Sequence, residues 1–141
     1  MTEKVPLDFQ DLAARLKAVT LPEVDVVVGI ASGGTVPAAL VAFQLNAPLR
    51  LIHLNLRDED NRPRRDAPEL QREFDAPPPG SRVLIVDDVS VSGATLRAAR
   101  AHLPGCEVST LVFKGNVEKA DFVLVPDVAS CVVWPWSSGG A

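Results

Sequence analysis

Residues 82–96 have the sequence RVLIVDDVSVSGATL, and this stretch decides the fold. Residues 83–86 form a continuous apolar run, which predicts a strand buried on both faces. Two adjacent carboxylates, Asp87 and Asp88, follow this run directly. The turn after them contains serine, glycine and threonine and leads into a pattern typical of a helix. The stretch therefore predicts one strand–turn–helix unit of a parallel α/β sheet.

Similar apolar runs lie on both sides of this unit. Helices are expected between them, one capped by Asp8 and one that ends before Pro48. Strands that are apolar throughout and alternate with helices indicate an α/β fold, a mostly parallel, Rossmann-like sheet with helices on both faces. Ligands bind such sheets at the carboxyl ends of the strands. The expected strands are 24–30, 49–54, 82–86, 108–113, 122–125 and 131–134, and the expected helices are 8–16, 36–43 and 94–103.

The turn after the acid pair has the chemistry of a phosphate site. Backbone N–H groups at the start of a helix bind phosphate, the hydroxyls of Ser92 and Thr95 add donors, and Gly93 lets the chain approach a ligand closely. Asp87 and Asp88 can accept hydrogen bonds from a vicinal diol or lie near a divalent cation. The simpler alternative is that Ser92 only caps the helix and that the two aspartates are solvated at the end of the strand.

A second loop of the same type lies at residues 26–37, which read VVVGIASGGTVP. The glycine pair Gly33-Gly34 stands at a helix start and suits a second anionic group. The spacing matches neither the GxGxxG nor the GxxxxGK[ST] nucleotide-binding motif. One glycine pair alone is more often structural. Two such loops on successive strands suggest a ligand with two phosphate groups that flank a sugar.

The segment 55–80 is polar and has no helical or strand pattern. Within residues 57–66 four arginines balance four acids, so this run is not a charged tail. A loop of this length inside a compact domain is usually an active-site lid, and the alternative is a solvated loop. We expect residues from about 57 to 77 to be mobile without ligand and to become ordered over it.

Length and composition bound the function. A chain of 141 residues predicts a single domain, residues 1–141, and 47% hydrophobic with 23% charged residues excludes a disordered, collagen-like or coiled-coil protein. The net charge of -4 argues against nucleic acid as a partner, and no apolar run reaches the roughly 20 residues of a membrane span. The start lacks a signal-peptide pattern, and Cys106 and Cys131 are too few for a disulfide framework, so we expect a cytoplasmic protein.

An acid pair after a buried strand also occurs in receiver domains. That fold needs more strands and helices after the pair than the residues following Asp88 can form. A dehalogenase-type phosphatase would need two aspartates separated by one residue, which this stretch does not have.

The run VLIVDDVSVSGATL at residues 83–96 resembles the motif that binds 5-phosphoribosyl 1-pyrophosphate (PRPP) in type I phosphoribosyltransferases. Ser92 stands where threonine is commoner in that family. Residues 28–40 resemble the family's pyrophosphate loop, and residues 56–64 occupy the place of its flexible catalytic loop. The resemblance covers residues 24–137.

The end of the chain narrows the resemblance to xanthine-guanine and hypoxanthine phosphoribosyltransferases, through Phe113-Lys114 and the VVWPW run at 132–136. It implies a short C-terminal hood, about residues 115–141, that recognises the base. Lys114 would reach the exocyclic oxygen of a 6-oxopurine, and the backbone of Val132 would face the edge of the base. As isolated residues, Lys114 would instead be a surface lysine and Val132 a core residue.

The resemblance also implies how the substrate is held. Asp87 and Asp88 would bind the ribose hydroxyls, with Asp88 beside a magnesium ion, and Arg57 would contact pyrophosphate. The other implied substrate-binding residues form two loops, Ser32, Gly33 and Gly34 at pyrophosphate, and Val89, Ser90, Val91, Ser92, Gly93, Ala94 and Thr95 around the 5'-phosphate.

The activity implied by the resemblance is a glycosyltransferase reaction of purine salvage, in which the 5-phosphoribosyl group of PRPP moves to a nitrogenous base, a 6-oxopurine, and pyrophosphate leaves. Its transition state has oxocarbenium character. Metal and backbone dipoles stabilise the departing pyrophosphate, while a closed lid excludes water. The implied ligands are PRPP, Mg²⁺ and a purine base or nucleoside monophosphate. A homo-oligomer is compatible with the sequence, and neither nucleic acid nor a membrane is an expected partner.

Three positions depart from the pattern of the purine enzymes. Ser32 stands where a basic residue usually precedes the glycines, Val91 where an aspartate usually faces the base, and Cys131 where an aromatic side chain usually stacks on it. The ribose-phosphate end keeps the family pattern. The alternative function is therefore a non-catalytic regulatory protein of the same fold that binds PRPP or a nucleotide. Trp134 and Trp136 are predicted to be hydrophobic cover.

Overall fold

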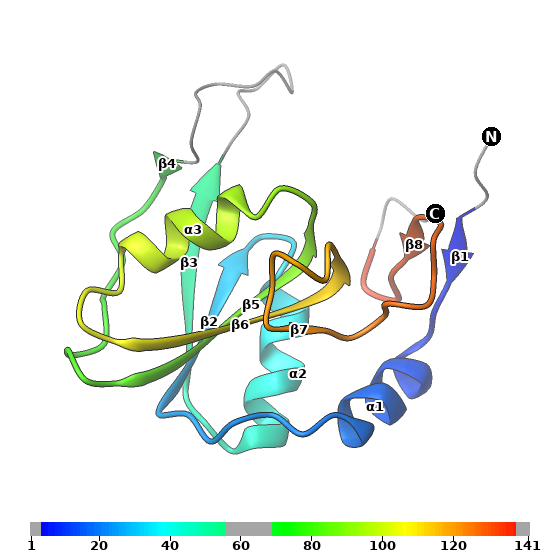
Figure 1. The fold of residues 1–141 in the computed structure, drawn as a ribbon, viewed down its shortest axis with the longest axis horizontal. Coiled ribbons are helices and arrows are strands. Elements are labelled where there is room, and N and C mark those ends of the chain that lie inside the picture. Colours follow the sequence, from blue (N-terminus) through cyan, green and yellow to red (C-terminus); the bar gives the residue numbers. More distant parts are fainter. Residues whose placement is uncertain (1–3, 56–68, 138–141) are drawn as a thin grey trace.

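The centre of the computed structural model, which describes residues 4–55 and 69–137, is a six-stranded sheet (Figure 1). Its strands are β2 (Val26–Ala31), β3 (Leu49–Asn55), β4 (Glu69–Leu70), β5 (Arg82–Ser90), β6 (Glu107–Gly115) and β7 (Phe122–Val123). They lie in the order β4-β3-β2-β5-β6-β7, and every neighbouring pair is parallel except β3 with β4. The prediction of a mostly parallel sheet is confirmed.

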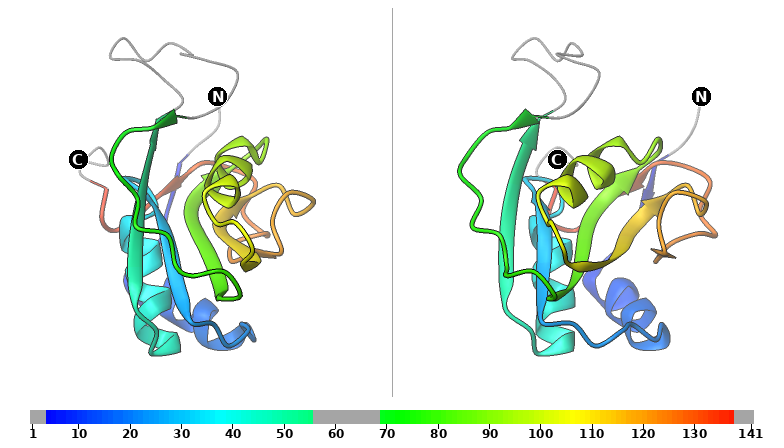
Figure 2. Two further views of the ribbon diagram at one scale, coloured as in Figure 1. Left: turned by 90° about the vertical axis from the view of Figure 1, so that its left-hand side faces the viewer. Right: turned by 60° about the vertical axis from the view of Figure 1, so that its left-hand side comes forward.

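Helices cover both faces of this sheet, as predicted (Figure 2). The helices are α1 (Phe9–Ala18), α2 (Thr35–Leu45) and α3 (Ala94–Ala101). In β5, Leu84 and Val86 belong to the core that includes α1 and α2, whereas Val83 and Ile85 belong to the core that includes α3. Because successive side chains of a strand point to opposite faces, a strand between two helix layers must be apolar throughout.

Short-range contacts set where the helices begin and end. Asp8 caps α1 as predicted, since its Oδ1 accepts the N–H of Asp11 at 2.8 Å and Asp11 Oδ2 accepts the N–H of Asp8 at 3.4 Å. The alternative in which Ser92 only caps the helix is wrong, because Gly93, with a φ of 82°, occupies the N-cap position of α3. In the described part of the chain, no helix is long and apolar enough to cross a membrane.

β5 is longer than the sequence predicts. The apolar run predicts an end at Val86, whereas the strand continues to Ser90, so that Asp87 and Asp88 lie within it. Pairing with β6 extends the strand, and its last pair joins Ser90 to Gly115. A Cβ at Gly115 would lie 2.0 Å from the carbonyl oxygen of Ser90, so only glycine permits this close approach.

Part of the polar segment 55–80 lies along the sheet. The N–H of Gln71 donates to the carbonyl of His53, and Phe74 packs in the core beside α3. Phe74 is an apolar contact that the polar composition of the segment does not predict. Residues 56–68, which include Arg57, lie outside the described residues.

The C-terminal segment returns to the N-terminus and forms a second, two-stranded sheet. Strand β1 (Val5–Pro6) runs parallel to β8 (Val132–Val133) beside α1 (Figure 1). The indoles of Trp134 and Trp136 stack at 5.2 Å between ring centroids, and both lie edge-on to Phe113 at 6.0 Å. Both tryptophans pack in the core on the α1 side, which confirms them as hydrophobic cover.

Candidate active site

The predicted site lies where β2 and β5 end at the same edge of the sheet. The two strands are parallel neighbours with Gly29 opposite Val86, so the residues that follow them lie side by side. Helices α2 and α3 begin at Thr35 and Ala94, so both helix N-termini also lie at this edge. The two loops that the sequence predicts to bind phosphate therefore meet.

Gly33 lies directly against the carboxylate of Asp88. A Cβ on Gly33 would lie 2.7 and 2.8 Å from the two carboxylate oxygens, so any side chain there would require the Asp88 carboxylate to shift. Gly34 fits between the strands, where a Cβ would lie 2.6 and 2.8 Å from carbonyl oxygens of β2 and β5. The exposed Ser32 follows Ala31 through a cis peptide bond. The glycine pair thus lets the loop after β2 lie directly beside the carboxylate of Asp88.

The two aspartates lie on opposite faces of β5 and differ in environment. Asp87 is 6% exposed and faces the α3 side, whereas Asp88 is half-buried and lies beside Gly33. Asp87 Oδ1 accepts the N–H of Asp88 at 2.8 Å, and Asp88 Oδ1 accepts the N–H of Val89 at 2.8 Å. Burial, followed by the negative charge of Asp88, raises the pKa of Asp87 to about 8. The alternative in which both carboxylates are solvated is therefore wrong for Asp87.

The turn after β5 presents backbone N–H groups toward the site. The first N–H groups of a helix have no intrahelical acceptor, and Gly93 caps α3 without a side-chain hydrogen bond. The hydroxyl of Ser92 accepts the N–H of Ala94 at 3.2 Å. Val91 is 74% exposed, and Thr95 is half-buried in the first turn of α3. Amides, hydroxyls and the positive end of the helix dipole thus give this turn the chemistry that anion sites use.

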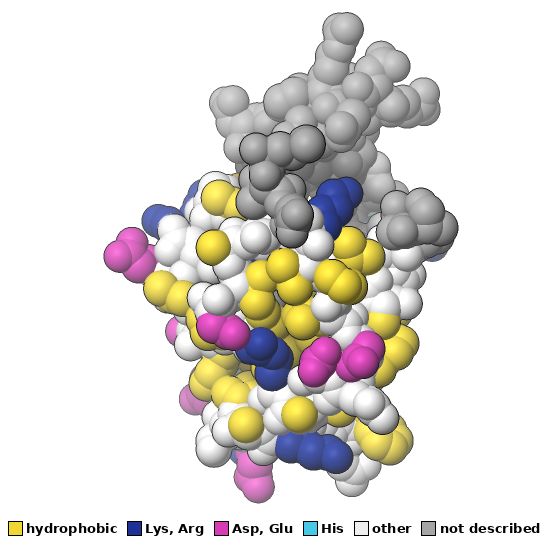
Figure 3. Space-filling model, turned by 90° about the vertical axis from the view of Figure 1, so that its right-hand side faces the viewer, with side chains coloured by type: hydrophobic (Ala, Val, Ile, Leu, Met, Phe, Trp, Pro, Cys, Tyr) yellow, Lys and Arg dark blue, Asp and Glu magenta, His cyan; other side chains and the backbone are white. Residues whose placement is uncertain are grey.

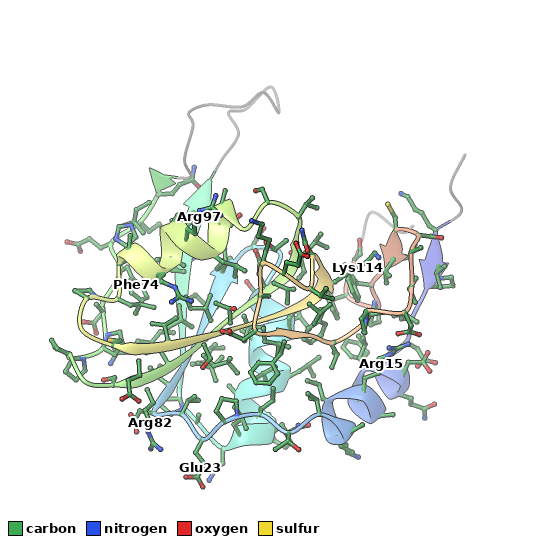
Figure 4. The ribbon with its side chains drawn as sticks, viewed as in Figure 1. Arg15, Glu23, Phe74, Arg82, Arg97 and Lys114 are labelled. Atoms are coloured by element: carbon green, nitrogen blue, oxygen red, sulfur yellow. The ribbon has the colours of Figure 1, made fainter. Side chains whose placement is uncertain are left out.

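Two basic residues beside this turn are not identified by the sequence analysis. Arg97 projects from α3, and its Nη1 donates to the carbonyl of Ser92 at 3.0 Å (Figure 4). Lys119 lies against Gly93, where a Cβ would be 3.3 Å from the Cβ of Lys119. Arg97 lies one helical turn after Gly93, and this spacing could have predicted its position beside the turn. Lys119 follows β6, and no local pattern predicts its contact.

The residues predicted to recognise the base come from β6 and β8. The ammonium group of Lys114 is half-buried and donates to the carbonyl of Val128, so Lys114 is not a simple surface lysine. The carbonyl groups of Cys131 and Val133 accept hydrogen bonds from Val5 and Leu7 at the N-terminus. Because carbonyl groups alternate in direction along a strand, that of Val132 points away from β1. The side chain of Val132 is half-buried and packs against the core on the α1 side, in line with the alternative of a core residue.

These features define a class of protein. A sheet covered on both faces carries an acid pair and two glycine-held turns at neighbouring strand ends, which is how α/β proteins bind phosphorylated sugars and nucleotides. The comparison with known families is consistent with this class, since the phosphoribosyl transferase domain matches residues 10–132. The chain belongs to that family.

Two curated relatives differ in the substrate that they are named for. The chain is 27% identical over 113 residues to the xanthine-guanine phosphoribosyltransferase of Idiomarina loihiensis, a match that covers 78% of this chain and 69% of the relative. It is 39% identical over 87 residues to the adenine phosphoribosyltransferase of Thermobifida fusca, covering 55% of this chain and 47% of the relative. Family membership therefore leaves the base open.

Solved structures support the fold. A purine phosphoribosyltransferase from Pyrococcus horikoshii superposes with a TM-score of 0.74 at 23% identity and covers 96% of this chain and 94% of its own. A protein of Neisseria gonorrhoeae described as hypothetical, solved with bound ppGpp, superposes with a TM-score of 0.77 at 21% identity and covers 98% and 91%.

Proposed function

We propose that this chain transfers the 5-phosphoribosyl group of PRPP to a 6-oxopurine and releases pyrophosphate, as in purine salvage. The contact between Gly33 and the carboxylate of Asp88 carries the proposal. In PRPP the pyrophosphate is bonded to C1 of the ribose, next to the 2-hydroxyl, so the ligand needs an anion site beside a hydroxyl acceptor. The 5'-phosphate would then occupy the turn 91–95.

The transfer forms a bond between a ring nitrogen of the base and C1 of the ribose, and it breaks the bond between C1 and pyrophosphate. Positive charge develops on the sugar ring and negative charge on the leaving group. The N–H groups of Ser32 and Gly33 would stabilise the departing pyrophosphate, whereas that of Gly34 donates to the carbonyl of Ile30 at 2.7 Å. Asp88 would stabilise the ring while it accepts a hydrogen bond from a ribose hydroxyl. Arg57, proposed as a further contact to pyrophosphate, is not among the described residues.

The acid pair fits Mg²⁺, which this family generally uses with PRPP. Within residues 4–55 and 69–137, no group of three or more His, Cys, Asp or Glu side chains could hold a metal ion. One or two carboxylates together with substrate phosphates is the usual environment of protein-bound Mg²⁺. Asp88, the more exposed of the pair, would hold the ion beside Asp87, and bound Mg²⁺ supplies charge neutralisation for the leaving group.

Lys114 and Val132 favour a 6-oxopurine as the acceptor. An ammonium group can only donate hydrogen bonds, so it suits an exocyclic oxygen and not an amino group. The bond of Lys114 to Val128 uses one of its three N–H donors. Lys114 pairs with Val89 just beyond the acid pair, so it lies at the same edge of the sheet as the ribose site. The carbonyl of Val132 could accept an N–H of the base.

Binding without turnover is the second candidate function. Val91 is 74% exposed at the position where the purine enzymes usually have an aspartate, and a valine can accept no proton. Cys131 is exposed and cannot stack on a purine as an aromatic side chain does. The Neisseria gonorrhoeae protein with bound ppGpp is an example of a nucleotide on this fold. In this case the site would bind PRPP or a nucleotide for regulation.

Turnover with a panel of bases separates the two candidates. The purified protein is incubated with PRPP, Mg²⁺ and either hypoxanthine, xanthine, guanine, adenine or orotate, and nucleotide and pyrophosphate are both measured. We expect nucleotide from a 6-oxopurine and its loss in the Asp88→Asn variant. Binding of PRPP without turnover of any base would support the regulatory function. Adenine or orotate as the best acceptor would contradict the assignment of the base.

A further inference from the structure

Arg15 of α1 holds the loop that leads to β8. Its Nη1 lies 2.7 Å from Asp127 Oδ1 and its Nη2 lies 3.1 Å from Asp127 Oδ2, which makes a bidentate ion pair. Nη1 also donates to the carbonyl of Leu124 at 3.3 Å. The ion pair joins residues 112 positions apart in the sequence, and the contact with Leu124 spans 109. They connect the first helix with the hood segment, and Figure 4 shows Arg15 on the side of α1 that faces it.

Other contacts hold the same segment on either side of Asp127. The ammonium group of Lys114 binds the carbonyl of Val128, the next residue along the chain. The ring of Phe9, in the first turn of α1, lies 6.1 Å from that of Trp136. Figure 3 shows the face that α1 and the hood form, where apolar side chains lie between charged ones. The loop is therefore fixed shortly before it reaches β8.

We infer that Arg15 is a positioning residue for recognition of the base. By holding Asp127 and the carbonyl of Leu124, it sets where the backbone of Val132 meets the base. The inference rests on the proposed role of the hood in base binding. Ribose and phosphate would bind at the ends of β2 and β5, which Arg15 does not contact. Loss of Arg15 should therefore weaken binding of the base and leave the affinity for the sugar phosphate unchanged.

A second arginine–aspartate pair provides a matched control. Arg82 Nη2 lies 3.0 Å from Asp25 Oδ1, and Arg82 Nε donates to Asp25 Oδ2 at 3.3 Å. This pair stands at the start of β5, at the opposite end of the strand from the acid pair. The Arg82 side chain is 48% exposed and that of Arg15 is 29% exposed. Exposed ion pairs contribute little to stability. Arg15 also contacts the carbonyl of Leu124, and no such contact is seen for Arg82 among the described residues.

Calorimetry of the whole chain with IMP, GMP and ribose 5-phosphate tests the inference without requiring turnover. We expect Arg15→Ala to raise the Kd of IMP and GMP about fivefold, the scale of one lost ion pair, and to leave the Kd of ribose 5-phosphate within about twofold. Arg15→Lys should recover only part of the loss, because lysine cannot form the bidentate contact. Arg82→Ala should change none of the three.

An equal loss of affinity for all three ligands in Arg15→Ala would contradict the inference, since it would indicate a general effect on folding. Unchanged affinity for IMP and GMP would also contradict it. So would a wild-type protein that binds IMP no more tightly than ribose 5-phosphate, because the hood would then not recognise the base. Absence of transferase turnover would contradict only the proposed reaction. If Arg15→Ala does not fold, Asp127→Asn tests the same loop while the contact with Leu124 remains.

Discussion

Replacement of Asp87 by asparagine should stabilise the ligand-free protein and weaken its binding of PRPP. The carboxyl group of Asp87 is buried beside that of Asp88, and this raises its pKa from 3.8 to about 8. Ionised Asp87 therefore destabilises the folded state relative to the unfolded chain, in which water solvates the carboxylate. Asparagine has nearly the same shape and no charge, and its side-chain oxygen can still accept the N–H of Asp88.

The stability that Asp87→Asn adds to the folded protein should increase as the pH rises. Because the pKa of Asp87 is higher in the folded state, its contribution to stability is fully present below pH 3.8 and is lost as the pH rises to about 8. The free energy of unfolding gained by Asp87→Asn should be near zero below pH 3.8. It should reach roughly 5 kcal/mol at pH 9, since each pKa unit corresponds to about 1.4 kcal/mol. For a chain of this size, Tm at pH 9 should rise by roughly 15–20 °C.

Thermal unfolding followed by circular dichroism at pH 4.5, 7 and 9 measures the effect. Glu118→Gln, which removes an exposed negative charge, is the matched control and should change Tm little at any of these pH values. Calorimetry on the same Asp87→Asn sample at pH 9, where Asp87 of the wild type is ionised, should show weaker binding of PRPP, because one charged acceptor is lost. No gain in Tm at pH 9, or an equal gain at pH 4.5 and pH 9, would refute the reasoning.

Three further substitutions test the loops around the acid pair. Gly33→Ala should weaken PRPP binding about tenfold or more in calorimetry, because the added methyl group would meet the Asp88 carboxylate at 2.7 Å; an unchanged Kd would contradict the contact. Val91→Asp should raise kcat with a 6-oxopurine about tenfold or more, because a carboxylate there can accept a proton, and should leave the Kd of PRPP within about twofold; no gain in kcat would show that Val91 is not a catalytic deficit. Arg97→Ala should raise KM for PRPP about fivefold by releasing the carbonyl of Ser92; an equal rise in KM for the base would argue against a local effect.

Much of the fold follows from short-range patterns in the sequence. Apolar runs predict the main strands because each strand lies between two layers of helices. The cap at Asp8 and the meeting of Gly33 with the acid pair were predictable for similar reasons. A capping box needs only neighbouring residues, and parallel strands bring their carboxyl ends to one edge.

The features that the sequence did not reveal depend on distant contacts. Aspartate is rare in strands, so the pattern predicts that β5 ends at Val86, whereas pairing with β6 extends it to Ser90. Ser92 has the usual chemistry of a helix cap, but the left-handed turn at Gly93 displaces it by one position. The pairing of Arg15 with Asp127 spans most of the chain, and no local pattern predicts such a contact.

Titration of PRPP into the wild-type protein and the Asp88→Asn variant, with and without Mg²⁺, tests the central claim most directly. We predict saturable binding to the wild type that Mg²⁺ strengthens. The variant should bind PRPP about tenfold to a hundredfold more weakly, the scale of a lost charge-assisted hydrogen bond. Absence of PRPP binding by the wild type, or equal affinity in the two proteins, would contradict the assignment of the acid pair and the glycine-held turns as a PRPP site.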